Sequence, residues 1–139
     1  MQIVVVDNTN RDLVQEFLST AGTTLETFRY FNKRNLNCLD NHLLTCIVMD
    51  SEGNINGYSH LDRENDVVWL GIAIVQGKTR KGIGKALIAF VLNEARKKHI
   101  SRIKLSVDSR NLAARSLYEK FNFKIIEEIN DICFYERIT

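Results

Sequence analysis

The chain has 139 residues, of which 45% are hydrophobic, and its 19 Lys and Arg against 17 Asp and Glu give a net charge of +2. This length suits one domain with a packed core, and so small a charge argues against nucleic acid as a partner. No segment approaches the ~20 apolar residues of a membrane helix, and no charged leader is evident at the start. We therefore expect a single cytoplasmic domain over residues 1–139, with no membrane partner.

The cysteines exclude two further classes of protein. Cys38, Cys46 and Cys133 are odd in number and show no CxxC or Cys/His pairing. A disulfide framework and a zinc site are therefore not expected. We expect buried free thiols, as in a reducing compartment.

Four signals along the chain mark the ends of helices. Asn10 can cap a first helix that Gly22 closes, and Thr23 with Glu26 forms a capping-box pattern for a second helix. Asn122 can take the left-handed conformation that ends the last helix.

Strand signals dominate the rest of the chain. Three apolar segments with short turns between them predict an antiparallel meander, and the nearly continuous apolar run 67–75 predicts a central strand covered on both faces. In chain order we expect a strand at 2–6, helices at 11–21 and 23–31, strands at 43–49, 55–61 and 67–75, a helix at 82–98, a strand at 102–107, a helix at 111–120, and strands at 123–129 and 132–138. This order is β-α-α-β-β-β-α-β-α-β-β.

A basic glycine turn precedes the helix at 82–98. Gly82 and Gly84 let the backbone approach a ligand closely, and the helix N-terminus offers free N–H groups and the positive end of its dipole, which together bind phosphate oxygens. The sequence therefore predicts a pyrophosphate site here. Four cations fall within eight residues at this turn: Lys78, Arg80, Lys81 and Lys85.

Two other phosphate-binding motifs fit less well. Ile83 stands where the P-loop requires lysine, and Leu87 stands where the dinucleotide fingerprint requires its third glycine. The remaining alternative is a basic surface turn that binds no ligand.

Two segments carry a resemblance to a known family. The turn Thr79-Arg80-Lys81-Gly82-Ile83-Gly84 resembles the acetyl-CoA-binding motif Q/R-x-x-G-x-G/A of the GNAT superfamily of N-acetyltransferases, with threonine at the first position. The stretch from Asn111 to Phe123 resembles the family's N-x-x-A-x-x-L-Y-x-x-x-G-F pattern, with Asn122 at the glycine. With the matching element order, the resemblance covers nearly the whole chain. It implies an α/β (α+β) fold with a mixed, mostly antiparallel sheet of about seven strands flanked by four helices.

The resemblance also implies acetyl-CoA as co-substrate, without a metal. The pyrophosphate would lie on the glycine turn, and the pantetheine arm would pair with the central strand in a gap where that strand splays from 104–107. Asn111 would hydrogen-bond the arm from the following loop. The cofactor-binding residues implied in this way are Ile72, Ala73, Ile74, Thr79, Arg80, Lys81, Gly82, Ile83, Gly84, Lys85, Asn111 and Ala114.

The resemblance assigns a catalytic acid but leaves the base open. Tyr118 matches the family position that protonates the departing thiolate, and a phenol with a pKa of about 10 keeps its proton at neutral pH; the alternative is a tyrosine that packs in the core. The carboxylate that many relatives use as base would fall at Val68, so His60, Asp62 and Asp66 remain candidates. His60 is a titratable imidazole beside the central strand, although it can also be structural; as the base it would make the rate rise with pH near ~6.5.

The acceptor pocket is expected between the second helix, the central strands and the last hairpin. Phe28 should pack inward, whereas Arg29, Tyr30 and Arg34 should be exposed to an acceptor, and Trp69 lines the pocket or fills the core. The implied activity moves an acetyl group to a primary amine, such as that of an amino sugar or another small molecule, by direct attack in a ternary complex of a monomer or homodimer. The alternative is a catalytically silent module that binds or senses acyl-CoA.

Overall fold

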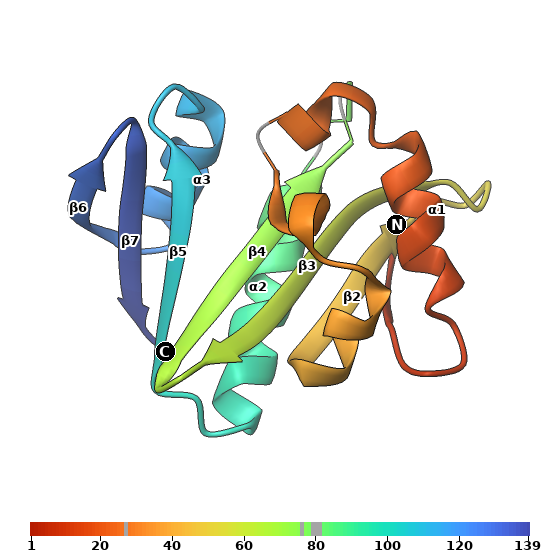
Figure 1. Cartoon of the computed structure of the whole chain (residues 1–139), viewed down its shortest axis with the longest axis horizontal. Helices are drawn as coiled ribbons and strands as arrows, with labels where there is room; N and C mark the ends of the chain where they lie inside the picture. Colours follow the sequence, from red (N-terminus) through yellow and green to blue (C-terminus); the bar gives the residue numbers. More distant parts are fainter. Residues whose placement is uncertain (27, 76, 79–81) are drawn as a thin grey trace.

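The computed structural model describes residues 1–26, 28–75, 77–78 and 82–139. Its centre is a seven-stranded sheet in the order β1-β2-β3-β4-β5-β7-β6 (Figure 1). Three α-helices and three 3-10 helices, the latter labelled η, flank this sheet in the described part of the chain. The elements are β1 (Gln2–Val5), α1 (Asp12–Thr20), η1 (Gly22–Glu26), η2 (Tyr30–Lys33), η3 (Leu36–Asn41), β2 (His42–Met49), β3 (Ile55–Glu64), β4 (Val67–Ile74), α2 (Ile83–Lys97), β5 (Arg102–Asp108), α3 (Leu112–Lys120), β6 (Lys124–Ile129) and β7 (Ile132–Ile138).

The sheet opens between its fourth and fifth strands. Neighbouring strands pair antiparallel except β4 and β5, which are parallel. Over the described residues, the register between β4 and β5 pairs Trp69 with Lys104 and no other position. Figure 1 shows the two strands meeting near the C-terminus and diverging from there. The predicted gap beside the central strand is therefore confirmed.

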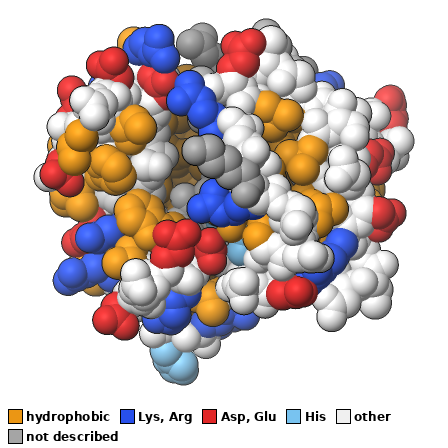
Figure 2. Space-filling view, viewed as in Figure 1, with side chains coloured by type: hydrophobic (Ala, Val, Ile, Leu, Met, Phe, Trp, Pro, Cys, Tyr) orange, Lys and Arg blue, Asp and Glu red, His pale blue; other side chains and the backbone are white. Residues whose placement is uncertain are grey.

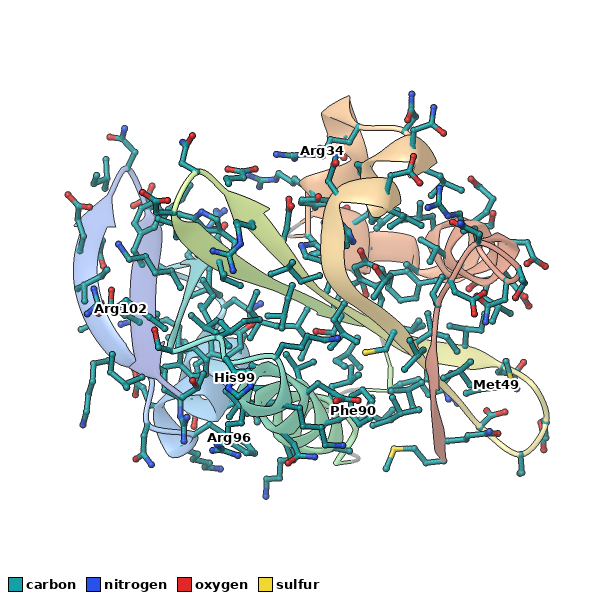
Figure 3. The ribbon with its side chains drawn as sticks, turned by 90° about the horizontal axis from the view of Figure 1, so that it is seen from below. Arg34, Met49, Phe90, Arg96, His99 and Arg102 are labelled. Carbon is teal, nitrogen blue, oxygen red and sulfur yellow. The ribbon has the colours of Figure 1, made fainter. Side chains whose placement is uncertain are left out.

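Two hydrophobic cores cover the two faces of the sheet. The larger one lies beneath α2 and α3 and includes Leu87, Ile88, Val91 and Tyr118, and the smaller one lies beneath α1 and includes Val14. Figure 3 shows this layering, with Phe90 and Arg96 on the side of α2 and Arg34 on the opposite side of the sheet. Every helix in the described ranges is too short or too polar to cross a lipid bilayer.

The fold class and the seven strands predicted from the sequence are confirmed, with β3 continuing to Glu64. Asn122 takes the predicted left-handed conformation, at φ 66°. Asn10, however, was wrongly expected to cap α1. Its Oδ1 accepts a hydrogen bond from the backbone N of Asp7 at 2.8 Å, and no side chain caps this helix.

The predicted helix 23–31 differs most from the structure. The segment forms the short 3-10 helices η1 and η2 in place of one continuous helix. Thr23 and Thr24 lose side-chain freedom in a helix, and their hydroxyls can bond elsewhere, which weakens the helical preference. The Thr24 hydroxyl does so, donating to the carbonyl oxygen of Ile74 at 2.8 Å.

Candidate active site

A cavity of about 1140 Å³ opens where β4 and β5 diverge. The space-filling view in Figure 2 shows the hollow near the middle of this face, with basic and acidic side chains at its rim. β4, the start of α2 and α3 line one part of the cavity, and the η1–η2 region, the end of β3 and β7 line the other. Among the described residues, no group of three His, Cys, Asp or Glu side chains is arranged to hold a metal ion.

Most of the residues predicted to bind the cofactor lie together at this cavity. Ile83 differs, since its side chain is buried in the core beneath α2 and does not line the cavity. Thr79, Arg80 and Lys81 lie outside the described residues. The predicted residues that line the cavity are Ile72, Ala73, Ile74, Gly82, Gly84, Lys85, Asn111 and Ala114.

The structure requires glycine at the two positions of the turn for different reasons. Gly82 precedes α2 with φ +80°, a conformation that L side chains rarely adopt. A Cβ on Gly84 would lie 2.6 Å from Cδ2 of Leu117. The small residue at position 84 therefore lets α2 approach α3, in addition to any role toward a ligand.

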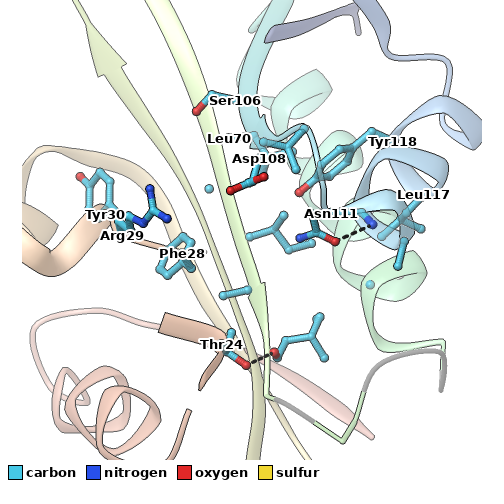
Figure 4. Close-up of a pocket in the computed structure, with 18 of the residues that line it drawn as sticks. Thr24, Phe28, Arg29, Tyr30, Leu70, Ser106, Asp108, Asn111, Leu117 and Tyr118 are labelled. Carbon is cyan, nitrogen blue, oxygen red and sulfur yellow. Dashed lines mark hydrogen bonds between the residues drawn. The ribbon is translucent and has the colours of Figure 1, made fainter. Parts of the chain in front are cut away.

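Two hydrogen bonds hold the walls of this part of the cavity (Figure 4). The bond from Thr24 ties η1 to the end of β4 through the carbonyl of Ile74. Oδ1 of Asn111 accepts from the backbone N of Ala114 at 3.2 Å and so caps α3. The Nδ2 group of Asn111 is the end of this side chain that can donate to a ligand.

Tyr118 extends from α3 into the cavity (Figure 4). Its ring also packs against Phe123 and Tyr135, with ring centroids 6.0 and 6.2 Å away. The ring therefore packs in the core and also lines the cavity, where a proton donor would be needed. Burial raises the pKa of Tyr118 well above its ordinary value, so the phenol remains a proton donor at neutral pH.

His60 lines the cavity but is almost fully buried, with 2% of its surface exposed. Its Nδ1 lies 2.7 Å from the hydroxyl of Tyr58, and its ring lies 4.2 Å from that of Tyr30 and 4.4 Å from that of His42. Burial lowers the pKa of His60 well below its ordinary value. If His60 acts as the base, the rate should therefore rise with pH at a lower pH than the ~6.5 expected from the sequence.

A chain of hydrogen bonds reaches a second titratable residue on the same face of β3. The hydroxyl of Tyr30 donates to Oδ2 of Asp62 at 2.8 Å and lies 2.7 Å from Nε2 of His42. Nδ1 of His42 lies in turn 2.9 Å from Oγ1 of Thr45. Asp62 is 7% exposed, lines the cavity and pairs across the strands with Trp69. The sequence named Asp62 as a candidate but did not reveal this chain.

The remaining candidate for the base, and the position that many relatives use for it, lie elsewhere. Asp66 is exposed in the turn between β3 and β4 and does not line the cavity. Val68 is buried in the core beneath α2, on the opposite face of β4 from Trp69.

The residues predicted for the acceptor pocket line the second part of the cavity. Arg29 is exposed, and its Nε donates to the carbonyl of Glu26 at 2.8 Å. Tyr30 is half-buried, with the guanidinium of Arg34 4.2 Å above its ring. Trp69 packs against Phe134 at a centroid distance of 6.2 Å and also lines the cavity.

Two residues that line the cavity were not predicted to do so. Phe28 packs inward as expected, against the core beneath α1 and Tyr58, but it is half-buried and also lines the cavity. Asp108 lies at the end of β5, where Arg110 binds it at 2.8 Å and lowers the pKa of its carboxyl group.

Comparisons with known proteins agree with this geometry. The family model described as the acetyltransferase (GNAT) family matches residues 9–123. Similar solved structures include PaiA N-acetyltransferase of Thermoplasma acidophilum in complex with coenzyme A (TM-score 0.78, 16% identity, 100% of both chains). Others are phosphinothricin acetyltransferase of Sinorhizobium meliloti in complex with acetyl-CoA (0.77, 14% identity, 99% of this chain and 87% of that one), and YncA of Salmonella typhimurium with acetyl-CoA (0.77, 18% identity, 99% and 93%). Among curated proteins, none matches the chain.

Proposed function

Because the chain belongs to the acetyltransferase (GNAT) family of acetyl-CoA-dependent enzymes, we propose that it acetylates a primary amine of a small molecule by direct attack in a ternary complex. The observation that carries this proposal is the cavity at the β4–β5 gap. One continuous space is lined by the glycine turn, by β4 and α3, and by a polar and aromatic region around Tyr30 and Trp69. It therefore has room for a donor and an acceptor at the same time.

The donor is expected to occupy the part of the cavity beside β4 and α2. The backbone N–H groups at the start of α2 would bind the pyrophosphate, helped by the positive charge of Lys85 at the rim. The backbone of β4 around Ile72 would pair with the pantetheine arm, since β5 leaves this edge open. Nδ2 of Asn111 would donate to the same arm.

The chemical step follows from this placement. The neutral amine nitrogen attacks the thioester carbonyl carbon, a C–N bond forms, and the C–S bond breaks. Tyr118 donates its proton to the leaving thiolate, and the proton that the amine releases returns through solvent to the Tyr118 phenolate, so the products are the amide and the free thiol of coenzyme A. Such help from a general acid is worth about 10²–10⁴-fold in rate.

Two further expectations belong to this proposal. A small-molecule acceptor fits a cavity of about 1140 Å³. The three free cysteines fit a protein that works in the reducing cytoplasm.

The test separates the enzyme from the silent acyl-CoA-binding module. Acetyl-CoA should raise the melting temperature, because a ligand that binds only the native state stabilises it. Incubation with acetyl-CoA and pools of small primary amines should release free thiol and yield acetylated products by mass spectrometry. A thermal shift without thiol release from any pool would favour the silent module, and no shift would refute the proposal.

A further inference from the structure

Three acidic side chains line the described part of the cavity, and two of them have cationic partners. Glu64 pairs with Arg34 at 3.5 Å, and Asp108 pairs with Arg110. The third is Asp62. None of the ion pairs found between described residues includes it.

Asp62 is buried, so the lack of an ion-pair partner affects the free energy of its carboxylate. A buried carboxylate is costly unless it is hydrogen-bonded and paired with a positive charge. Its described hydrogen bond comes from a neutral donor, the hydroxyl of Tyr30. The guanidinium of Arg34 stacks on the Tyr30 ring and pairs with Glu64, and it forms no ion pair with Asp62.

The hydrogen bonds around Asp62 can all point toward its carboxylate. The donors can run in one direction, from Thr45 to His42, from His42 to Tyr30, and from Tyr30 to Asp62. Burial keeps His42 neutral by lowering its pKa, which lets one ring nitrogen accept while the other donates. The ionisable groups near Asp62 in the described part of the chain include Tyr30, Arg34, Cys38, His42, Tyr58, His60 and Glu64.

An aromatic wall stands beside this carboxylate. Trp69 lies directly opposite Asp62 in the β3–β4 register, so both side chains are on one face with their Cβ atoms about 5 Å apart. Phe134 packs against Trp69, and Phe28 lines the same part of the cavity. An ammonium group next to Asp62 would gain both an ion pair and the attraction of the aromatic face.

From this arrangement we infer that Asp62 and Trp69 bind the ammonium group of the acceptor, and that the preferred acceptors are primary amines with an apolar or aromatic body. The inference rests on the proposed function. Tyr30 and His42 are positioning residues that hold the carboxylate.

The chain supplies its own reporter for this site, because Trp69 is its single tryptophan. Phenethylamine is titrated into the protein saturated with coenzyme A, and binding is followed by tryptophan fluorescence. Phenethyl alcohol, which has the same body without the positive charge, is titrated in parallel. Acetyl-CoA is first shown to raise the melting temperature of each variant.

Asp62→Asn should weaken phenethylamine binding roughly thirtyfold or more, as expected for loss of one partner of a buried charge pair, and leave the alcohol unchanged. Asp66→Asn is the matched control and should change neither. Tyr30→Phe should weaken only the amine, by roughly three- to tenfold, whereas general damage to the pocket would weaken both probes.

Unchanged amine binding in Asp62→Asn, an equal loss of both probes, or no amine response in the wild type would each overturn the inference. With the acetyl-CoA shift intact, these results leave the proposed function standing. If acetyl-CoA does not raise the melting temperature of the wild type, the proposed function itself is refuted.

Discussion

Gly71→Ala should destabilise the protein by about 1–2 kcal/mol, because it places a methyl group where the His60 ring lies. The new Cβ would be 2.4 Å from Cε1, 2.5 Å from Nε2 and 3.0 Å from Nδ1 of that ring. The ring cannot easily move aside, since it is bonded to Tyr58 and packed against Tyr30 and His42. Overpacking typically costs about 1–3 kcal/mol. Alanine offsets ~0.4–1 kcal/mol of this cost, because it lowers the conformational entropy of the unfolded chain relative to glycine.

Gly57→Ala is the matched control for this substitution. It also replaces a glycine within the meander, but the nearest atoms to its Cβ would be side-chain methyl groups of Ile83, Leu87 and Ile74, at 3.1–3.3 Å. Those flexible ends can yield by a few tenths of an ångström, so we expect a smaller loss than at Gly71. Urea unfolding followed by circular dichroism measures both.

A double-mutant cycle shows whether the imidazole is the cause. On a His60→Ala background, Gly71→Ala should cost little, because the space that the ring filled is then empty. The reasoning is refuted if Gly71→Ala is no worse than Gly57→Ala, or if it costs the same on both backgrounds.

Tyr118→Phe should lower the turnover number by about 10²–10⁴-fold, through loss of the general acid, and leave acetyl-CoA binding unchanged; equal turnover would make Tyr118 a packing residue only. Because burial lowers the pKa of His60 in the folded state, the unfolded chain takes up this proton first as pH falls, so stability should be lost below about pH 6.5. Denaturant titrations from pH 7.5 to 5 should show a shallower loss in His60→Gln, and a parallel loss would contradict the assignment. Burial raises the pKa of Cys46 to about 12, and Cys133 is equally inaccessible, so both should resist iodoacetamide in the native protein and react after unfolding. Mass spectrometry of the labelled protein checks this, and native labelling at either thiol would count against the structure.

The features that sequence predicted well depend on residues close together in the chain. The strand pattern, the left-handed Asn122 and the position of the helix after the glycine turn all follow from local spacing and backbone preference. The splay beside β4 was expected from the resemblance and is present.

The features that could not be predicted from the sequence depend on residues that are far apart in the chain and close together in the fold. Tyr30, His42 and Asp62 come from a 3-10 helix and two strands, and their hydrogen bonds span 12 and 32 positions. Alternation along β3 can place His60 and Asp62 on one face, but it cannot show which of them finds hydrogen-bond donors. The 3-10 segment that carries Tyr30 was itself predicted as one continuous helix, so the partner of Asp62 could not be found from pattern alone.

The divergence of β4 from β5 also affects how the protein behaves at high concentration. An open strand edge presents unpaired N–H and C=O groups, which invite pairing with another chain and lead toward aggregation. In most sheets such edges lie on the two outer strands. In this sheet an open edge lies between the fourth and fifth strands, which are paired at Trp69 and Lys104 and diverge beyond that position. If acetyl-CoA occupies this edge as proposed, it shields the protein as well as supplying the acetyl group. The lifetime of the protein in solution would then follow the size of the coenzyme A pool around it.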